Sequence, residues 1–503
     1  MKSVSCALIF LFLVSAVNAD YLEPKCELAL RGTNAPIDVH VLQAADLDGD
    51  GNVELIAASK NGVVYGMEYR NCETDWQAKW MINTMGVAQD FKIADTDGDG
   101  KSEVVVAVDG GRSNVEVIGS NGVSRWISKQ VAAMSYSVDV ADINGDGIVE
   151  IILGSKNNAV YAVKDKSTEV WRAATDDPVH FVRAEDFDGD GSMEVLALSK
   201  KYGSAKLYLI SGSGKVLWTY NIEGGVDLAS KNTVVVGDFN GDGKMEAVVA
   251  SNRGLVCVGH DGKKLWSYVT KDELDNVKSA TCVRNFVVGG RNIVFVGAQP
   301  YIYKLDGKGG YFWKSTVNTT VYDFFVEDLD GDGIEEVIVG ARKFIHVFDN
   351  DGFLLSTWSY KEEIRGQDYR DDFDIFRDEQ VLIGQRLFQV KDASAKSVVA
   401  GDFDGDGMME VAAGFGWEEA TLRGNTYHGK LLVFEVNPQD VVSTTTTLPA
   451  LTTTTLPSAS TTLEPSTTTT TYWTTTTTTL AEKAGGCCPI FPLGFILRLL
   501  GFS

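Results

Sequence analysis

A nine-residue acidic motif recurs along the chain, and it limits the fold more than any other feature. Its copies are "DLDGDGNVE", "DTDGDGKSE", "DINGDGIVE", "DFDGDGSME", "DFNGDGKME", "DLDGDGIEE" and "DFDGDGMME", which begin at residues 46, 95, 142, 186, 238, 328 and 402. Most neighbouring copies are 44 to 52 residues apart, and the copies at 238 and 328 are 90 apart, about two such intervals. A fixed period of this length indicates a repeat architecture.

Tryptophans repeat with the same period. They stand at residues 80, 126, 171, 218, 266, 313 and 358, which are 45 to 48 residues apart. Trp266 and Trp313 bracket the interval that has no acidic motif, and there the segment 279–305 keeps the strand pattern but lacks the acidic loop. We expect these tryptophans to pack between repeats, because their strand context is regular; a ligand platform is the alternative.

Each repeat contains four short apolar or alternating runs, broken by Gly, Asn and Asp, which are strand and turn signals. Four strands in about 45 residues predict an all-β fold, an eight-bladed β-propeller, with a seven-bladed ring as the alternative. The last repeat supplies only three strands, whereas residues 26–32 form a spare strand near the N-terminus. We therefore expect the N-terminal strand to complete the last blade and close the ring.

One interval is irregular. The 43 residues between Trp358 and the last motif include a stretch, 371–390, that resembles 327–348. Residues 367–391 are thus either a partial blade or an inserted hairpin, and we favour the insertion.

The acidic motif has the form expected of a metal-binding loop. Asp or Asn at positions 1, 3 and 5 places oxygens on one side of a turn, Gly at 4 and 6 lets the backbone curl, and Glu at 9 closes the site. Hard oxygen ligands in this number suit Ca²⁺ better than Mg²⁺, which demands stricter octahedral geometry. An Asp-Gly turn alone would not require the Glu. Seven Ca²⁺ would add 14 positive charges to a net charge of −24.

The motif resembles the calcium-binding FG-GAP/VCBS repeat over residues 26–436, with "VGAQP" (296–300) and "GFG" (414–416) echoing that family's name. The resemblance implies a calcium-binding propeller with ligands at loop positions 1, 3, 5 and 9, and a backbone carbonyl at position 7. The implied ligands are Asp46, Asp48, Asp50, Asn52, Glu54, Asp95, Asp97, Asp99, Lys101, Glu103, Asp142, Asn144, Asp146, Ile148, Glu150, Asp186, Asp188, Asp190, Ser192, Glu194, Asp238, Asn240, Asp242, Lys244, Glu246, Asp328, Asp330, Asp332, Ile334, Glu336, Asp402, Asp404, Asp406, Met408 and Glu410. The tryptophan-bearing strands are similar to those of eight-bladed quinoproteins, which supports eight blades without implying that cofactor.

The ends of the chain predict export and display. Residues 1–19 read as a signal peptide, 20–440 as the propeller, 441–480 as a Thr-rich disordered stalk and 481–503 as a short apolar tail. The tail could associate with a membrane or the cell envelope, act as a sorting signal or serve as a docking peptide. Asn318 begins one glycosylation sequon. In an oxidising compartment the four cysteines of the predicted propeller allow three pairings; we expect Cys26 to pair with Cys72, with Cys257 and Cys282 as the candidate second bridge.

The predicted function is calcium-dependent binding of an extracellular protein or glycan at the cell surface. A net charge of −24 argues against nucleic acid as a partner. The five histidines show no metal-ligand spacing, and the sequence carries no nucleophile, zinc or phosphate-loop motif, so we expect no enzyme. A secreted carbohydrate-active enzyme, such as a polysaccharide lyase on the same scaffold, is the alternative. The sequence leaves the oligomeric state open.

Overall fold

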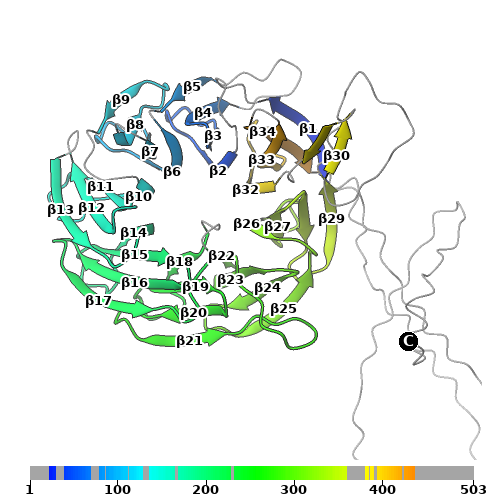
Figure 1. Ribbon diagram of the computed structural model, residues 1–503. Helices are drawn as coiled ribbons and strands as arrows, with labels where there is room; N and C mark the ends of the chain where they lie inside the picture. Colours follow the sequence, from blue (N-terminus) through cyan, green and yellow to red (C-terminus); the bar gives the residue numbers. More distant parts are fainter. Residues whose placement is uncertain are drawn as a thin grey trace, which may run out of the picture. The chain divides into compact units, whose positions relative to one another are not determined.

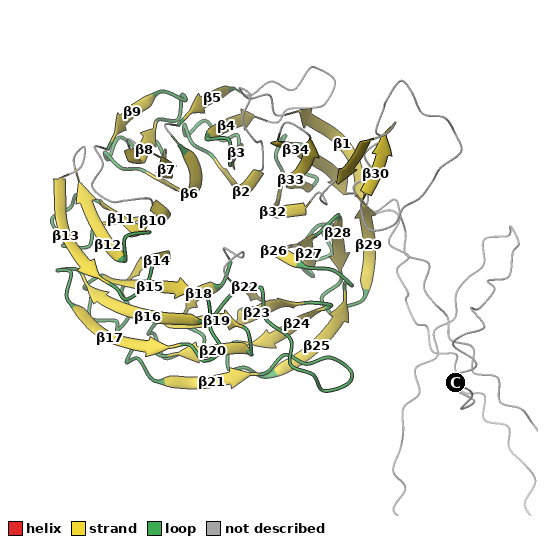
Figure 2. Ribbon diagram, viewed as in Figure 1, coloured by secondary structure: helices red, strands yellow, loops and turns green. Residues whose placement is uncertain are grey.

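A computed structural model shows eight four-stranded antiparallel sheets arranged as blades around a central channel (Figures 1 and 2). The prediction of an all-β, eight-bladed propeller is confirmed, and the seven-bladed alternative is wrong. Every regular element among the described residues is a strand, and no helix long and apolar enough to cross a membrane is found there. The innermost strand of each blade runs along the channel, and the fourth lies at the rim.

Each of the first seven blades consists of four consecutive strands, numbered from the channel outward. Blades 1 to 4 are formed by β2 (Val39–Ala45), β3 (Glu54–Ser59), β4 (Val63–Glu68) and β5 (Trp80–Asn83); β6 (Val87–Ala94), β7 (Glu103–Gly110), β8 (Ser113–Ile118) and β9 (Ser124–Ile127); β10 (Ser135–Ala141), β11 (Glu150–Ser155), β12 (Ala159–Lys164) and β13 (Thr168–Ala174); β14 (Val179–Glu185), β15 (Glu194–Lys201), β16 (Ser204–Ser211) and β17 (Val216–Asn221).

Blades 5 to 7 continue the same pattern. They are formed by β18 (Val234–Gly237), β19 (Glu246–Ser251), β20 (Gly254–Val258) and β21 (Lys264–Tyr268); β22 (Cys282–Val288), β23 (Arg291–Ala298), β24 (Tyr301–Asp306) and β25 (Tyr311–Thr316); β26 (Val321–Glu327), β27 (Glu336–Ala341), β28 (Phe344–Phe348) and β29 (Leu354–Ser359).

Blade 8 closes the ring with a strand from the other end of the chain. It combines β32 (Ser394–Gly401), β33 (Glu410–Thr421) and β34 (Gly424–Val436) with β1 (Leu22–Ala29), in the order β1-β34-β33-β32. β1 pairs antiparallel with β34, so Leu28 lies opposite Leu431. The predicted N-terminal clasp is confirmed, with the strand a few residues earlier than 26–32.

The structure describes residues 22–29, 39–68, 79–84, 86–110, 113–128, 135–164, 168–227, 232–359, 380–383, 386–389, 394–421 and 424–436, all within the unit Met1–Asp440. The predicted signal peptide, stalk and tail, and Cys72, lie outside these residues. Within 367–391, β30 (Gln380–Ile383) and β31 (Arg386–Gln389) form a separate two-stranded sheet. That sheet agrees with an inserted hairpin; the remainder of the insert lies outside the described residues.

The second strand of a blade is buried because sheets cover both of its faces. β3, β11, β19 and β27 are buried at every residue. The cores lie between neighbouring blades: Leu198 of blade 4, for example, shares a cluster with Val249 of blade 5. Sheets packed face to face around a ring thus bury continuous apolar runs, instead of the alternating pattern of a half-exposed strand.

The periodic tryptophans join each blade to the next, as the sequence predicts. Trp171 of blade 3 donates its Nε1–H to the Gly212 carbonyl oxygen of blade 4 at 2.8 Å. A Cβ atom on Gly214 (φ +85°) would lie 2.8 Å from the Trp171 ring, so only glycine fits beneath it. The same hydrogen bond is made by Trp80, Trp218, Trp266 and Trp313 to the carbonyl oxygens of Ser120, His260, Gly307 and Asn350.

The predicted disulfide between Cys257 and Cys282 is wrong, because both thiols are free and buried. Cys257 packs in the core between blades 5 and 6, whereas Cys282 packs in the core between blades 6 and 7. The sheet of blade 6 therefore lies between the two side chains. The prediction relied on the two cysteines lying in adjacent blades, but their side chains point into different cores.

Candidate functional site: acidic loops and a central cavity

The seven acidic motifs occupy equivalent places in seven blades. Each motif connects the first strand to the second: β2 ends at Ala45 and β3 begins at Glu54, with residues 46–53 between them. Blade 6 is the exception, because β22 and β23 are joined directly through Gly289 and Gly290, which have φ of +55° and +74°. Loops of neighbouring blades contact one another: the Ser102 N–H donates to the Leu47 carbonyl oxygen, and the Met245 N–H to the Phe187 carbonyl oxygen, both at 3.0 Å. The loops therefore share one end of the ring.

The first Asp of each motif organises its loop. In blade 7, Asp328 accepts the amide N–H of Gly331 through Oδ1 at 2.8 Å and that of Gly333 through Oδ2 at 2.9 Å. Both glycines have positive φ, +75° and +85°, which explains why the motif keeps glycine at these two positions. Asp332 then accepts the N–H of Ile334 at 2.8 Å, so the backbone turns around the carboxylates.

The Glu that ends each motif is buried. Its Oε2 accepts the amide N–H of the second loop residue, at 2.9 Å between Glu336 and Leu329. The same bond, at 2.8–3.1 Å, is made by Glu54, Glu103, Glu150, Glu194, Glu246 and Glu410.

Burial makes a negative charge on several of these glutamates unfavourable. It raises the pKa of Glu336 to about 8, against the opposing hydrogen bond from Leu329, and the loop aspartates add to the effect. Burial also raises the pKa of Glu246 and of Glu410 to about 7, and raises that of Glu194. A cation nearby would favour the ionised form of each.

Five of the seven loops bring three carboxylates together, with ligand oxygens within 4.8 Å of one another. They are Asp46, Asp48 and Asp50; Asp95, Asp97 and Asp99; Asp186, Asp188 and Glu194; Asp328, Asp330 and Asp332; and Asp402, Asp404 and Glu410. The loops of blades 3 and 5 carry Asn144 and Asn240 at position 3 instead. Both asparagines donate an Nδ2–H to the Glu of their own loop, at 2.7 and 3.0 Å.

The residues present fit a divalent ion. Glu410 is fully buried, yet no group of the described residues donates a hydrogen bond to its Oε1, and the same holds for Asp48 Oδ1 in blade 1. Buried carboxylate oxygens without donors are costly unless a cation faces them. The donor set is entirely oxygen, from side chains and a tight loop backbone, which is the set that Ca²⁺ prefers.

Two loops contain a positive side chain that the sequence analysis did not assign to them. In blade 1, Lys79 Nζ lies 2.9 Å from Glu54 Oε1 and 3.1 Å from Asp48 Oδ2. In blade 2, Arg125 reaches Glu103 Oε1 at 3.0 Å and forms a second ion pair with Asp97. Burial alone would lower the pKa of Lys79, but hydrogen bonds to these carboxylates raise it above its ordinary value, so the ammonium stays charged.

A sequence signal for these cations exists. Lys79 and Arg125 immediately precede the periodic tryptophans of blades 1 and 2, and Arg125 stands at a bulge in β9. At the corresponding bulge, blades 3 to 6 carry apolar residues: Val170, Leu217, Leu265 and Phe312. Blade 3 receives a cation from another strand, since Lys164 Nζ lies 3.1 Å from Asp146 Oδ2.

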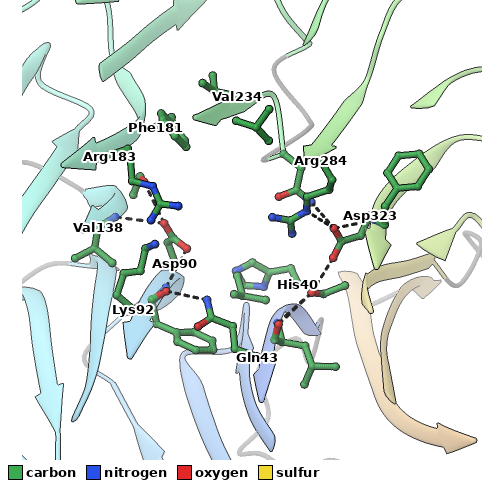
Figure 3. A pocket seen from close by; sticks show the side chains of 18 of the residues that line it. His40, Gln43, Asp90, Lys92, Val138, Phe181, Arg183, Val234, Arg284 and Asp323 are labelled. Atoms are coloured by element: carbon green, nitrogen blue, oxygen red, sulfur yellow. Dashed lines mark hydrogen bonds and ion pairs between the residues drawn. The ribbon is translucent and has the colours of Figure 1, made fainter. Parts of the chain in front are cut away.

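A second candidate site is the cavity inside the channel, with a volume of about 420 Å³ (Figure 3). All eight first strands line it, with residues such as His40–Gln43 of β2 and Asp323–Phe325 of β26. These residues lie in the first half and middle of their strands, whereas the acidic loops follow the strand ends. The cavity and the acidic loops therefore lie at different levels along the channel.

Lys92, Arg183 and Arg284 line the cavity from blades 2, 4 and 6, and its lining also includes His40, His180, Asp90 and Asp323. Figure 3 shows Lys92 and Arg183 on one side and Arg284 on the other. The sequence analysis assigned no role to any of them, because their strand segments carry no repeated motif.

A profile of the family described as FG-GAP-like repeat matches residues 46–106, 95–153 and 186–249. No curated protein matches the chain significantly. Similar solved structures include BBS1N in complex with ARL6DN, soaked with lead (11% identity, 67% of this chain and 96% of that one, TM-score 0.44), and BamB from Moraxella catarrhalis (14%, 82% and 99%, 0.45). Another is the V. cholerae biofilm matrix protein Bap1 (13%, 84% and 92%, 0.39). The repeat family suggests a role in protein interaction or recognition.

Proposed function

Since this chain is an FG-GAP repeat β-propeller, we propose that it is an exported recognition module that binds an extracellular protein or glycan. In this proposal it carries no catalytic activity, and Ca²⁺ ions in the acidic loops stabilise its ring of blades. One observation carries the proposal: a buried Glu facing two or three loop aspartates recurs at the same place in seven blades. A catalytic centre would need such a group once, whereas a structural device is repeated.

Calcium is the ion we favour because the loops offer only oxygen ligands, which Ca²⁺ prefers, without the strict octahedral geometry that Mg²⁺ demands. Extracellular modules bind Ca²⁺ with dissociation constants of about 0.1–1 mM, close to the concentration outside cells. At a free concentration about tenfold above its Kd, each site would add about 1.4 kcal/mol to the free energy of unfolding. Seven sites would add about 10 kcal/mol, which is comparable to the stability of a whole domain.

The proposal separates support from recognition. The acidic loops lie at one end of the ring, which leaves the channel and the connections at the other end for a ligand. Residues 1–19 would direct the chain to export, and residues 441–503 would supply the stalk and the tail that keep the propeller at the surface. Loops carried on a rigid scaffold are the usual location of binding residues.

The test is capture of a ligand by the mature chain, with the tail replaced by a tag. Intact cells would be incubated with the tagged propeller in calcium or in chelator, and bound material would be identified by crosslinking and glycan release. We expect saturable binding that chelation removes and calcium restores. Equal capture with and without calcium would contradict the proposal, and turnover of a purified acidic polysaccharide would contradict the non-catalytic assignment.

A further inference from the structure

We propose that the central cavity binds the carboxylate of an acidic sugar, a hexuronate unit of a glycan, between Lys92, Arg183 and Arg284. This inference rests on the proposed recognition function and assigns its ligand class and site. The three basic side chains come from blades 2, 4 and 6, and their side chains are 30%, 37% and 39% exposed. A chain of net charge −24 thus places three cations around one cavity.

The acidic residues of the cavity are already engaged by the walls. Asp323 is 1% exposed and accepts hydrogen bonds from the Phe324 and Val398 N–H groups, from Ser397 Oγ and from Asn232 Nδ2. The bonds from Ser397 and Val398 join blade 7 to blade 8, and together these donors stabilise the negative charge of Asp323.

Asp90 has the same role between two other blades. It accepts the Val138 N–H at 3.3 Å and the Ser137 hydroxyl at 3.1 Å, which joins blade 2 to blade 3. Donors of the channel wall therefore bind both carboxylates, Asp323 and Asp90.

The basic groups keep donors for a ligand. Arg284 uses its Nε on Asp323 at 2.7 Å, and among the described residues no hydrogen bond engages its two terminal nitrogens. Arg183 Nε lies 3.8 Å from Glu185, beyond hydrogen-bond distance, and Lys92 Nζ lies 3.4 Å from Asp139. Guanidinium groups with free terminal nitrogens bind carboxylates by two parallel hydrogen bonds.

The remaining wall suits a sugar rather than an acidic peptide. Aromatic rings of Tyr136 and His180 stack on one another at 4.5 Å, and Phe181, Phe286 and Phe325 add further half-buried ring faces. Gln43 and Asn285 contribute amides. Ring faces beside amides match the apolar faces and hydroxyl groups of a pyranose. A cavity of about 420 Å³ is at the small end of ligand sites, which suits one or two sugar units better than a folded peptide.

Calorimetric titration of the mature, calcium-loaded chain with a trigalacturonate, and with maltotriose as the neutral match, tests the site. We expect binding of the acidic trimer that weakens with salt, and at least tenfold weaker binding of the neutral one. Arg183→Gln should weaken binding of the acidic trimer by about tenfold or more. Arg253→Gln, at a surface arginine that is 68% exposed and ion-paired with Glu223, should leave it unchanged.

Several outcomes would overturn the site. They are equal binding of the two trimers, no binding of either, wild-type affinity in Arg183→Gln, and displacement of the acidic trimer by a short Asp/Glu peptide at lower concentration. Because Arg183 makes no hydrogen bond with the described residues, its replacement should leave the melting temperature unchanged, which separates lost affinity from misfolding. If the titrations fail but the chain still captures a ligand from cells in a calcium-dependent way, the cavity is not the binding site and the proposed function still holds.

Discussion

The acidic loops of blades 1 and 2 differ from those of blades 4 and 7 in one respect: the chain itself supplies their positive charge. Lys79 and Arg125 enter the first two loops and pair with the buried Glu54 and Glu103. In blades 4 and 7, no Lys or Arg among the described residues pairs with the carboxylates of the motif. Glu336, in blade 7, is the loop glutamate whose pKa is raised furthest, to about 8.

This difference teaches that seven nearly identical motifs need not depend on metal equally. A buried carboxylate requires either a cation or a proton, because its ionised form loses hydration on burial. Blades 1 and 2 contain a cation in their own sequence, so their loops should keep their geometry without metal and bind it more weakly. In blades 4 and 7 no Lys or Arg of the described residues pairs with the loop carboxylates, so these loops should depend on a divalent ion.

Chelation should have the largest effect. Removing divalent ions from the mature chain should lower its melting temperature by on the order of 10 °C or more, because about 10 kcal/mol of binding free energy is lost. Hydrogen exchange should locate the loss, with faster exchange in β15 and β27 than in β3 and β7. If chelation leaves the melting curve unchanged, or if the four strands exchange hydrogen at the same rate, the proposed difference in metal dependence between these blades is wrong.

Replacing the terminal Glu should separate the two kinds of loop. In blade 7, Glu336→Gln should remove one bound ion and about 1.4 kcal/mol of stability in calcium. It should cost little in chelator, because burial raises the pKa of Glu336 to about 8 and glutamine resembles the protonated carboxyl. In blade 2, Glu103→Gln leaves Arg125 without its buried partner, so about 1–3 kcal/mol should be lost in either condition. Urea unfolding with and without calcium measures both variants.

The two glutamate variants serve as controls for one another, since each removes one negative charge at the same loop position. Identical calcium dependence of the two losses would show that Arg125 does not substitute for a metal ion.

Arg125→Met should convert blade 2 to the type of blade 4. The variant keeps the aliphatic stem but removes the guanidinium from Asp97 and Glu103, so blade 2 should bind Ca²⁺ more tightly. We expect a gain of about one tightly bound ion in equilibrium dialysis and a larger stabilisation by calcium than in the wild type. An unchanged number of bound ions would mean that the guanidinium and the metal do not compete.

The reverse substitution should have the smallest effect. Leu217 stands at the bulge of blade 4 that corresponds to Arg125, and its side chain is 47% exposed. Leu217→Arg should place a guanidinium near Asp188 and Glu194 and weaken calcium binding in that loop. Val216→Arg, one residue earlier on the same strand, is the matched control and should leave binding as in the wild type. Equal effects of the two variants would point to a general charge effect.

Much of the fold could be predicted because every repeat carries the same signals for its strands and turns. The acidic motif fixes the turn between the first and second strands, the tryptophan fixes the contact with the next blade, and the spare N-terminal strand predicts the clasp of β1 on β34. Cys257 and Cys282 fall outside this logic: sequence order placed them in adjacent blades but could not tell which face of blade 6 each would occupy.

The site could be predicted only where residues repeat. The seven loops follow from their spacing, but the cations that enter two of them stand about 25 residues later in the chain, with Lys79 just before β5 and Arg125 in β9. The cavity was invisible for a related reason. Lys92, Arg183 and Arg284 are far apart in sequence, and only closure of the ring brings the first strands of blades 2, 4 and 6 around one space.

The most direct test of the central claim is an anomalous-scattering map from crystals of the mature chain equilibrated with about 1 mM calcium, the concentration range at which extracellular sites fill. The account predicts strong calcium peaks within the loops of blades 4 and 7, next to Glu194 and Glu336, and weaker or absent peaks where Lys79 and Arg125 enter their loops. Empty loops in blades 4 and 7 would contradict it, as would equal peaks in all four blades.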